Sequence, residues 1–524
     1  GSRVSWGDRG IVGAAVAAGI GAAAFLGHAS MGFIITFYLA PILLTALAGW
    51  LLVTGGLRWP TRRAGLVIII LGVFAASLGV RLDGIDGNFK AFWKPRWEKT
   101  QEDRFLAERE VAQDLSAASG PLAVRPGDWP EFRGSPQRRS IVEGVSIATD
   151  WDKNPPKLLW KKRVGPGWSS FAVVDGRAFT QEQRGPAEVV VCYDANTGKE
   201  IWTHEDPTRF MEALAGPGPR ATPTFHDGKI YAQGANGVLN CLDARTGTTI
   251  WSREIAKDSG SKIPQWGFSA SPLVSSGIVT VYGGAKGKAV LAYDAATGAP
   301  LWEAGDGELT YCSTQLSTID GVEQLLISTN EGALALDPKT GKQLWRHEWP
   351  LAGMARVVQP WVIGSDILIG TSFDIGTRRV HVEHDKDSWQ TKEVWTSRAV
   401  KPYYNDFVVD DNHLYGFDGA FFTCVDLKDG KRKWRERGYG NGQTLLLADQ
   451  KLLVILTETG EVALVAADPT GHRELARMDG LEGKTWNHPV VAEGKLFIRN
   501  GQEAACFELT PLSAAEDPRA APKK

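Results

Sequence analysis

The sequence predicts an all-β, eight-bladed β-propeller preceded by two to three transmembrane helices. The main observation is a repeat: YDANTGKEIW (Tyr193–Trp202) recurs with its last residue at Trp251, Trp302, Trp345 and Trp434. Adjacent repeat ends lie 39 to 51 residues apart, about the length of one four-stranded blade. A second observation is a set of apolar runs before residue 85, two of them long enough to cross a bilayer.

Each copy of the repeat predicts a strand, a tight turn and a second strand. The turn is marked by Asp and Gly, because Gly adopts positive φ without strain, and an aromatic residue ends the second strand. The blade ends are Trp160, Trp202, Trp251, Trp302, Trp345, Trp395, Trp434 and Leu475. Two copies are degenerate: Thr391 takes the place of the turn Gly in one, and the other ends on Leu475. Seven blades are therefore the alternative.

The two ends of the repeat region complement each other. KLLW (157–160) has the ending of a blade without three strands before it, and residues 484–509 predict three strands without a fourth. We therefore expect the N-terminal strand to complete the last blade, which closes the ring and removes exposed strand edges.

Residues 1–85 are predicted to be a membrane anchor with helices near 10–26, 33–55 and 64–80. The first run has two interpretations: a helix, or a signal peptide with Arg3 and Arg9 as its basic region. If it is a helix, Gly13, Ala17 and Gly21 share one face that suits close helix packing.

Positive charge predicts the orientation of the anchor. Arg58, Arg62 and Arg63 lie in one short loop, which places that loop inside and the rest of the chain outside. The predicted location is the bacterial inner membrane, with the propeller facing the periplasm or exterior. Residues 86–126 are predicted to be a charged helical linker that is solvated, 127–511 the propeller, and 512–524 a disordered tail.

Composition excludes several classes of function. The net charge is −2 and no basic stripe occurs, so nucleic acid is not an expected partner. Five cysteines occur without a CxxC or an adjacent pair, which argues against a disulfide scaffold and a zinc ribbon. Cys192, Cys241 and Cys424 each lie two residues before the repeat Asp, in a slot for small apolar side chains. Cys312 has no assigned role.

One position in the first strand of every blade is polar. Its occupants are Ser170, Thr222, Ser271, Gln315, Gln359, Asp406, Thr444 and His488. Innermost strands line the central channel of a propeller, so alternation predicts a polar ring there. The ring could bind a ligand, or it could simply face water in a polar channel.

Aromatic residues lie a few positions earlier, nearer the channel mouth. They include Trp168, Trp266, Tyr311, Tyr403, Tyr404 and Trp486. Aromatic walls with convergent polar groups are the default hypothesis for a binding site.

The D-x-x-T-G-x-x-x-W repeats resemble those of the pyrroloquinoline-quinone dehydrogenase-like propellers. That superfamily has eight blades and includes quinoprotein alcohol dehydrogenases and the propeller lipoprotein of outer-membrane protein assembly. The opening WPEFRGSP (129–136) is similar to the start of bacterial quinone-binding-like propellers. The resemblance covers residues 128–509.

The resemblance implies a possible quinone cofactor with Ca²⁺, and it assigns roles to ring and mouth residues. The catalytic candidates are Asp406, as base or metal ligand, and His488, as a group that titrates near neutral pH. The candidates for cofactor binding are Trp168, Arg220, Trp266, Arg356, Tyr404, Asn405, Asn441, Trp486 and Asn487. Asp406 is the only acid in the ring. One carboxylate is few for Ca²⁺, which takes six to eight oxygen ligands, so no metal site is predicted.

Two functions of different classes follow. The favoured one is a membrane-anchored extracytoplasmic scaffold that binds a protein or ligand through its channel mouth, with a membrane or periplasmic protein as partner. The alternative is a pyrroloquinoline-quinone-dependent dehydrogenase that oxidises an alcohol or sugar and passes electrons to a membrane quinone. A sensor for a small ligand at the same mouth is a third possibility.

Overall fold

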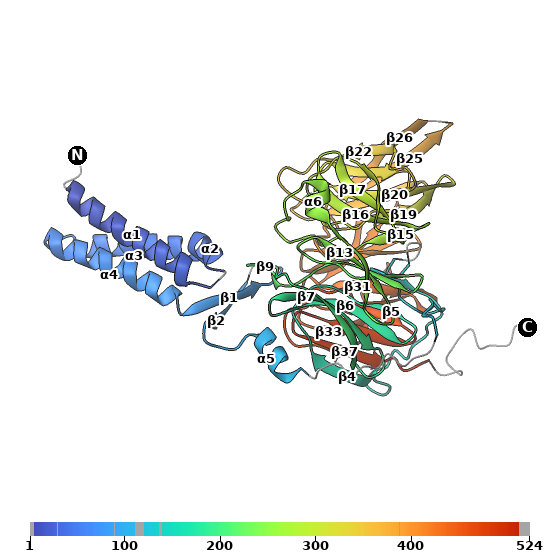
Figure 1. Ribbon diagram of the computed structural model, residues 1–524, viewed down its shortest axis with the longest axis horizontal. Helices are drawn as coiled ribbons and strands as arrows, with labels where there is room; N and C mark the ends of the chain where they lie inside the picture. The colour runs from blue at the N-terminus through green and yellow to red at the C-terminus, as the bar shows by residue number, and fades with distance from the viewer. Residues whose placement is uncertain are drawn as a thin grey trace, which may run out of the picture. The chain divides into compact units, whose positions relative to one another are not determined.

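The computed structural model describes residues 5–28, 30–88, 90–109, 120–135, 139–386 and 388–512. The chain forms two compact units (Figure 1). The first is Gly1–Thr100 with Met211–Pro217, and the second is Gln101–Phe210 with Gly218–Lys524. We call them the anchor unit and the propeller unit.

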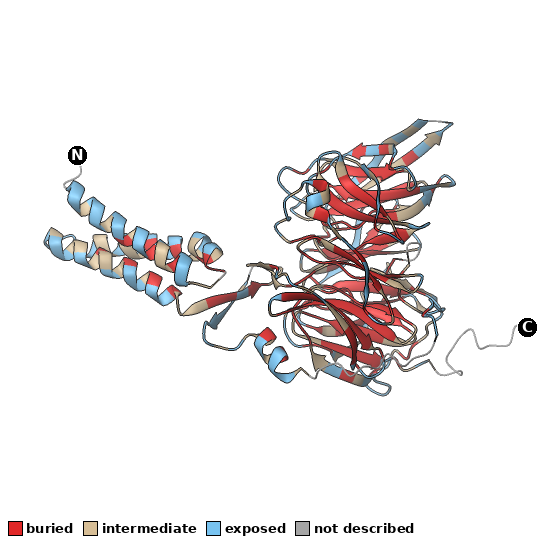
Figure 2. Ribbon diagram, viewed as in Figure 1, coloured by how far each residue is buried: buried red, intermediate tan, exposed pale blue. Residues whose placement is uncertain are grey.

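The anchor unit contains three helical spans, within its described residues, that are long and apolar enough to cross a membrane. The first is α1 (Trp6–Leu26) and the third is α4 (Trp59–Ser77). The second is one continuous run of α2 (Met31–Ile34), the π-helical segment η1 (Ile35–Leu39) and α3 (Ala40–Val53). Pro41 lies in the first turn of α3, directly after the π-helical segment, and a proline is tolerated at the start of a helix because it has no N–H to donate. Most of the outward helix surface is exposed in Figure 2, as lipid-facing side chains would be.

Helix α1 packs through a different face from the one expected. Ala15, Gly19 and Ala23 are buried, and a Cβ placed on Gly19 would lie 2.2 Å from the Phe74 ring of α4. A Cβ on Gly13 or Gly21 would meet no described atom within 4 Å. The predicted packing face of Gly13, Ala17 and Gly21 was therefore wrong. Small residues occur on both faces of α1, and the face that packs is the one that contacts α4. Arg63 and Asp8 form an ion pair at 2.6 Å, so the N-terminal ends of α1 and α4 lie at the same end of the helical bundle.

A β-hairpin follows the helices. It consists of β1 (Val80–Ile85) and β2 (Ala91–Pro95). The Ile85 N–H donates to the Leu214 carbonyl, next to the small ladder of β9 (Met211–Glu212) and β10 (Gly216–Pro217). The predicted helical linker therefore begins with a strand. Its described helix is α5 (Gln101–Glu108), and residues 110–119 and 513–524 lie outside the described residues.

The propeller unit contains eight radial sheets within the described ranges, which confirms the eight-bladed prediction. Blades 1 to 4 are β5 (Ala172–Val174), β6 (Arg177–Arg184), β7 (Ala187–Asp194) and β8 (Glu200–Asp206); β11 (Thr224–His226), β12 (Lys229–Gln233), β13 (Val238–Asp243) and β14 (Thr249–Glu254); β15 (Leu273–Ser275), β16 (Ile278–Ala285), β17 (Lys288–Asp294) and β18 (Pro300–Ala304); and β19 (Gln315–Ile319), β20 (Val322–Thr329), β21 (Gly332–Leu336) and β22 (Gln343–Glu348).

Blades 5 to 8 are β23 (Trp361–Ile363), β24 (Asp366–Thr371), β25 (Gly376–Asp385) and β26 (Ser388–Ser397); β27 (Val408–Asp410), β28 (His413–Asp418), β29 (Phe421–Asp426) and β30 (Arg432–Glu436); β31 (Gln443–Leu447), β32 (Leu452–Leu456), β33 (Glu461–Ala466) and β34 (Glu474–Asp479); and β35 (Val490–Ala492), β36 (Lys495–Arg499), β37 (Glu503–Glu508) and β4 (Lys157–Arg163). The short elements are β3 (Ile141–Val142), α6 (Ile255–Ser259) and η2 (Ala448–Gln450). Buried residues run along the strands of every blade in view (Figure 2).

Strand β4 closes the ring as predicted. It pairs antiparallel with β37, and Trp160 lies opposite Cys506. Trp160 packs on the turn between β7 and β8 of blade 1, where a Cβ on Gly198 would lie 2.7 Å from the indole. The Trp160 Nε1 donates to the Ala195 carbonyl in the same turn at 3.0 Å. Gly198 is therefore required twice, by its φ of 66° and by the approach of the indole.

The degenerate copy in blade 5 has a different turn from the predicted one. Thr391 lies inside β26 rather than in a turn, because β25 and β26 are ten residues each and turn after Asp385. Near the tip, His384 stacks on Trp389 with ring centroids 3.9 Å apart. The hairpin packs beside β22, where the Thr391 hydroxyl lies 3.2 Å from His347 Nδ1. Figure 1 shows it projecting beyond its blade.

Candidate functional site

The described residues 129–135 and 139–142 contact the innermost part of the blades around the central channel, which the sequence did not predict. The Trp129 N–H donates to Val173 of blade 1, and the Phe225 N–H of blade 2 donates to Pro130. Ser140 accepts from Leu446 N–H of blade 7, and β3 then runs parallel to β31. Together with the contacts below, the segment reaches the innermost strands of seven blades. We call it the channel segment.

The channel segment neutralises Asp406. Arg133 Nη1 lies 2.7 Å from Asp406 Oδ2, and its Nη2 donates to the Phe407 carbonyl at 3.1 Å. Both side chains are buried, and burial raises the pKa of Asp406 while the Arg133 charge opposes that rise. The carboxylate proposed as a base is thus half of a buried ion pair.

His488 is held as a neutral ring. The Ser140 hydroxyl lies 2.8 Å from Nε2, and Nδ1 lies 2.6 Å from the Pro489 carbonyl, so Nδ1 carries the proton. Trp129 and Phe132 pack against the imidazole. Burial, with the nearby Arg133 charge, lowers the pKa of His488 to about 3. The expectation that it titrates near neutral pH was wrong, because the channel segment removes it from water.

The polar ring joins neighbouring blades. The Ser170 N–H donates to Thr222 Oγ1 at 3.0 Å, and the Thr222 N–H donates to Ser271 Oγ at 2.9 Å. The Ser271 N–H continues the series to Ser313 Oγ at 2.8 Å. Arg139 of the channel segment donates to Gln315 and to the Pro360 carbonyl. All eight ring residues are buried. In these pairs the polar atoms of the ring form hydrogen bonds between neighbouring blades or with the channel segment.

The mouth aromatics form a continuous row of six rings. Consecutive centroids are 5.0, 4.6, 5.3, 5.8 and 4.9 Å apart along Trp168, Trp486, Tyr404, Tyr403, Trp266 and Tyr311. We call this set the aromatic row. Lys484 Nζ lies 4.2 Å from the Trp486 ring centroid and 5.1 Å from that of Trp168. Five of the six rings are partly exposed, so the row presents apolar surface with one cation above it.

A buried acid orients the row. Glu458 Oε1 accepts from Trp486 Nε1 at 2.8 Å and from the Tyr404 hydroxyl at 3.4 Å. Its Oε2 accepts from the Asn441 N–H at 3.0 Å. The polar tips of two mouth rings therefore point into the protein. Sequence reasoning missed Glu458, since no repeat position marks an acid in the turn between the second and third strands of a blade.

The remaining predicted residues divide into two groups. Arg356 is buried and donates to the carbonyls of Thr329 and Trp349, which places it within blade packing, and burial lowers its pKa to about 10. Arg220 lies over the Phe210 ring at 4.5 Å. Arg356 meets the aromatic row through its backbone, because its carbonyl accepts from the Tyr311 N–H at 2.8 Å.

The three asparagines hold mouth loops. Asn487 Nδ2 donates to the Ser169 carbonyl at 2.7 Å, and Asn405 Oδ1 accepts from the Tyr403 N–H at 3.0 Å. Asn441 Nδ2 donates to Glu458 at 3.3 Å. Within the described residues, buried Asn405 Nδ2 and Asn487 Oδ1 have no hydrogen-bond partner.

The residues do not fit a Ca²⁺–quinone centre. Calcium takes six to eight oxygen ligands, several of them carboxylate. Asp406, the one ring carboxylate, faces Arg133 instead, and the described residues contain no group of three His, Cys, Asp or Glu side chains placed to hold a metal ion. All five cysteines are buried and free, which fits the structural role expected of Cys192, Cys241 and Cys424.

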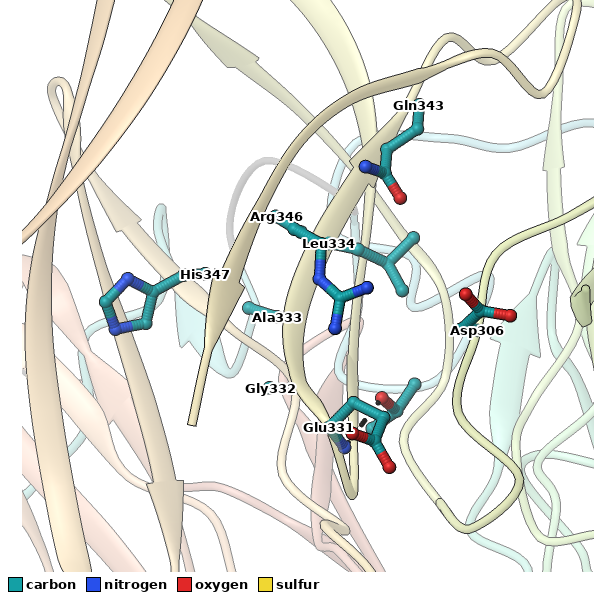
Figure 3. Close-up of a pocket in the computed structure, with 9 residues that line it drawn as sticks. Asp306, Glu331, Gly332, Ala333, Leu334, Gln343, Arg346 and His347 are labelled. Atoms are coloured by element: carbon teal, nitrogen blue, oxygen red, sulfur yellow. Dashed lines mark hydrogen bonds between the residues drawn. The ribbon is translucent and has the colours of Figure 1, made fainter. Parts of the chain in front are cut away.

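Hollows at the outer rim are a separate feature. One between blades 3 and 4 has a volume of about 10 Å³, enough for a single water. In Figure 3 Asp306, Glu331 and Arg346 surround it, while the His347 ring lies on the other side of its strand. A groove of about 320 Å³ lies one blade earlier, over the Tyr293–Asp258 hydrogen bond of 2.9 Å.

Comparison with known proteins gives one family. The model described as "outer membrane protein assembly factor BamB" matches residues 145–263, 186–436 and 384–516, well over half of the chain. No curated protein matches. Solved structures that resemble the chain include a europium-containing methanol dehydrogenase, at 13% identity and a TM-score of 0.53, covering 74% of this chain and 98% of that one.

Two further structures resemble it. The quinohemoprotein alcohol dehydrogenase from Comamonas testosteroni is 16% identical with a TM-score of 0.51, and the match covers 79% of this chain and 85% of that one. BamB from Moraxella catarrhalis is 15% identical with a TM-score of 0.46, and the match covers 67% and 97%. At these identities the two dehydrogenases show a shared fold.

Proposed function

Because the chain belongs to the PQQ-like propeller family whose model is described as outer membrane protein assembly factor BamB, we propose that it is a membrane-anchored scaffold that binds a protein or ligand through its channel mouth. The fold alone does not choose between scaffold and enzyme, since propellers carry unrelated functions in their sites. The choice rests on the aromatic row.

The observation that carries the proposal is the fixed orientation of that row. Glu458 holds Trp486 and Tyr404 by their polar tips, so these rings are ordered before a partner arrives. Ordered aromatic side chains lose little entropy on binding, which is why Trp and Tyr dominate interface hot spots. The channel beneath them is occupied by the channel segment, so the accessible surface is the mouth.

We place the propeller outside the cytoplasm of a bacterial cell, anchored in the inner membrane. Arg58, Arg62 and Arg63 flank the start of α4, and the Arg63–Asp8 pair groups them with the start of α1. A side of the anchor that is rich in arginine faces the cytoplasm by the positive-inside rule. The partner is then a membrane or periplasmic protein, or a ligand in that compartment.

The test is site-specific photo-crosslinking in membranes that contain the full chain. A photoreactive residue at Tyr404 should give an adduct of one defined mass, and the same residue at Leu301 on the outer strand β18 should not. The change Trp486→Ser should abolish the Tyr404 adduct. No adduct at Tyr404, or equal adducts at both positions, contradicts the proposal.

The alternative is a quinone-dependent dehydrogenase, which similarity to two dehydrogenase structures supports at the level of fold. Titration of the purified chain with pyrroloquinoline quinone and Ca²⁺, followed by Trp fluorescence and a dye-linked oxidation assay, decides between the two. We expect neither binding nor turnover. Binding with turnover that Asp406→Ala abolishes would establish the enzyme instead.

A further inference from the structure

Four large apolar side chains lie exposed on loops of one face of the propeller. Ile263, Leu309, Met354 and Phe373 are 46%, 36%, 37% and 40% exposed. The first three lie in the loops between blades 2 and 3, 3 and 4, and 4 and 5, and Phe373 lies in the turn between β24 and β25. Antiparallel strand order puts all four loops on the mouth face. We call the four residues the apolar crescent.

The apolar crescent differs from the other exposed apolar residues of the blades. Leu158, Ile250, Leu301 and Val394 are also exposed, but they lie singly on outer strands, one or two positions before a repeat Trp. Their exposure follows from the repeat, because each outer strand alternates one face inward and one outward. This explanation does not apply to the apolar crescent, since its residues lie outside any strand, three in consecutive inter-blade loops and Phe373 in a turn of blade 5.

Phe373 is held in a strained conformation. Its φ is 57° and that of Asp374 is 61°, a region that bulky side chains rarely adopt. The ring packs edge-on against Tyr403 at 5.1 Å, yet 40% of the residue stays exposed. Strain that keeps an aromatic ring at a surface points to a role there.

We propose that the apolar crescent inserts into the surface of the bilayer that the anchor helices cross. Three apolar spans tether the chain to a membrane, so a bilayer is always within reach. The connection between blades 1 and 2, Met211–Pro217, belongs to the same compact unit as those helices. Separate apolar loop tips suit a fluid apolar phase, which needs no shaped groove.

Charges of both signs lie beside the apolar crescent. Glu308 precedes Leu309, and Asp374 pairs with both Arg398 and Lys401 at 3.3 Å. The cations nearest Phe373 already have a carboxylate partner, so we expect insertion to depend on apolar contact and to occur in neutral phosphatidylcholine.

The experiment uses the full chain in phosphatidylcholine nanodiscs that contain acyl-chain nitroxide lipid. Phe373→Cys and Met354→Cys each carry a fluorophore, which labels selectively because the five native cysteines are buried. Leu301→Cys, 49% exposed on β18, is the matched control. We expect lipid quenching at 373 and 354 at least about twofold stronger than at 301. Phosphatidylglycerol should not change it.

Equal quenching at the three positions, or quenching that needs phosphatidylglycerol, overturns the proposal. The sample contains only lipid and this chain. If a partner protein covers these loops in cells and they do not insert into lipid, quenching in this sample should be equal at the three positions. Phe373→Cys removes the ring that packs on Tyr403 of the aromatic row. Met354→Cys alters no residue of that row, so the label at 354 gives the result that is independent of the mouth proposal.

Discussion

At the residue scale, the channel segment changes the meaning of Asp406 and His488. Sequence alone marks them as polar groups around a channel, the setting in which a base or metal ligand is expected. The structure adds Arg133 at 2.7 Å from one and Ser140 at 2.8 Å from the other. Both contacts come from residues more than 250 positions away in the chain, so no local pattern could announce them.

His488 should make stability depend on pH. Its folded pKa of about 3 lies below the ordinary 6.5, so the unfolded chain binds a proton first as pH falls. The stabilisation is complete above about pH 6.5 and is lost progressively toward pH 3, by about 2 kcal/mol at pH 5. Denaturant unfolding of the full chain in detergent at pH 7.5 and pH 5 measures it. His488→Gln should show a loss smaller by that amount; an equal loss would contradict the assignment.

Trp302 should contribute less than its counterpart Trp251. Trp251 Nε1 donates to the Ala295 carbonyl at 3.1 Å, whereas Trp302 Nε1 is buried without a partner. The following turn has Pro338 where the other turn has Ala295. Trp251→Phe should therefore destabilise by about 1 kcal/mol more than Trp302→Phe, the value of one hydrogen bond. Parallel thermal melts test this, and an equal cost for both changes would refute it.

At the element scale, α5 is docked rather than solvated. Glu102 forms an ion pair with Arg209 at 2.7 Å and accepts from the Gly185 N–H at 2.7 Å. Phe105 is buried beneath the Arg184 guanidinium, 5.3 Å from its ring centroid. The charged composition of this stretch suggested a solvated spacer, and that expectation was wrong because its charges have partners on blade 1.

Phe105→Ser should release α5 from blade 1. Loss of its buried ring removes apolar contact worth about 2 to 3 kcal/mol, enough to open a helix of two turns. Hydrogen exchange followed by mass spectrometry should show faster exchange in 101–108, with the blades unchanged. Leu106→Ser is the control, because Leu106 is exposed on the same helix. Equal exchange in both variants would argue against docking.

At the scale of the whole molecule, closure by β4 ties the two ends of the propeller together. The strand pairs with β37 over residues 157–163, and Trp160 then joins blade 8 to the Gly198 turn of blade 1. Within the described residues, β3 also comes from this early part of the chain, and it pairs parallel with β31 in the sheet of blade 7. Closure leaves no radial gap where blades could separate.

Breaking β4 should therefore cost more than breaking an ordinary outer strand. Lys161→Pro removes the backbone N–H of β4 at the position paired with Ala505 of β37. Ser252→Pro makes the same change in β14, at the position paired with Asn240. Each costs roughly 3 kcal/mol locally, and only the first also opens the ring. Limited proteolysis of the full chain should cut Lys161→Pro faster, in blades 1 and 8. Equal rates would show that the ring is held without its closure strand.

The sequence by itself determined the eight blades, their closure and the membrane spans. These follow from local rules: a turn that requires Gly, alternation of apolar residues, and helix length against bilayer thickness. The tertiary structure alone decided which α1 face packs, where the channel segment lies, and that Glu458 orients the aromatic row. Each of these depends on contacts between residues far apart in the chain, and such contacts leave no periodic signal.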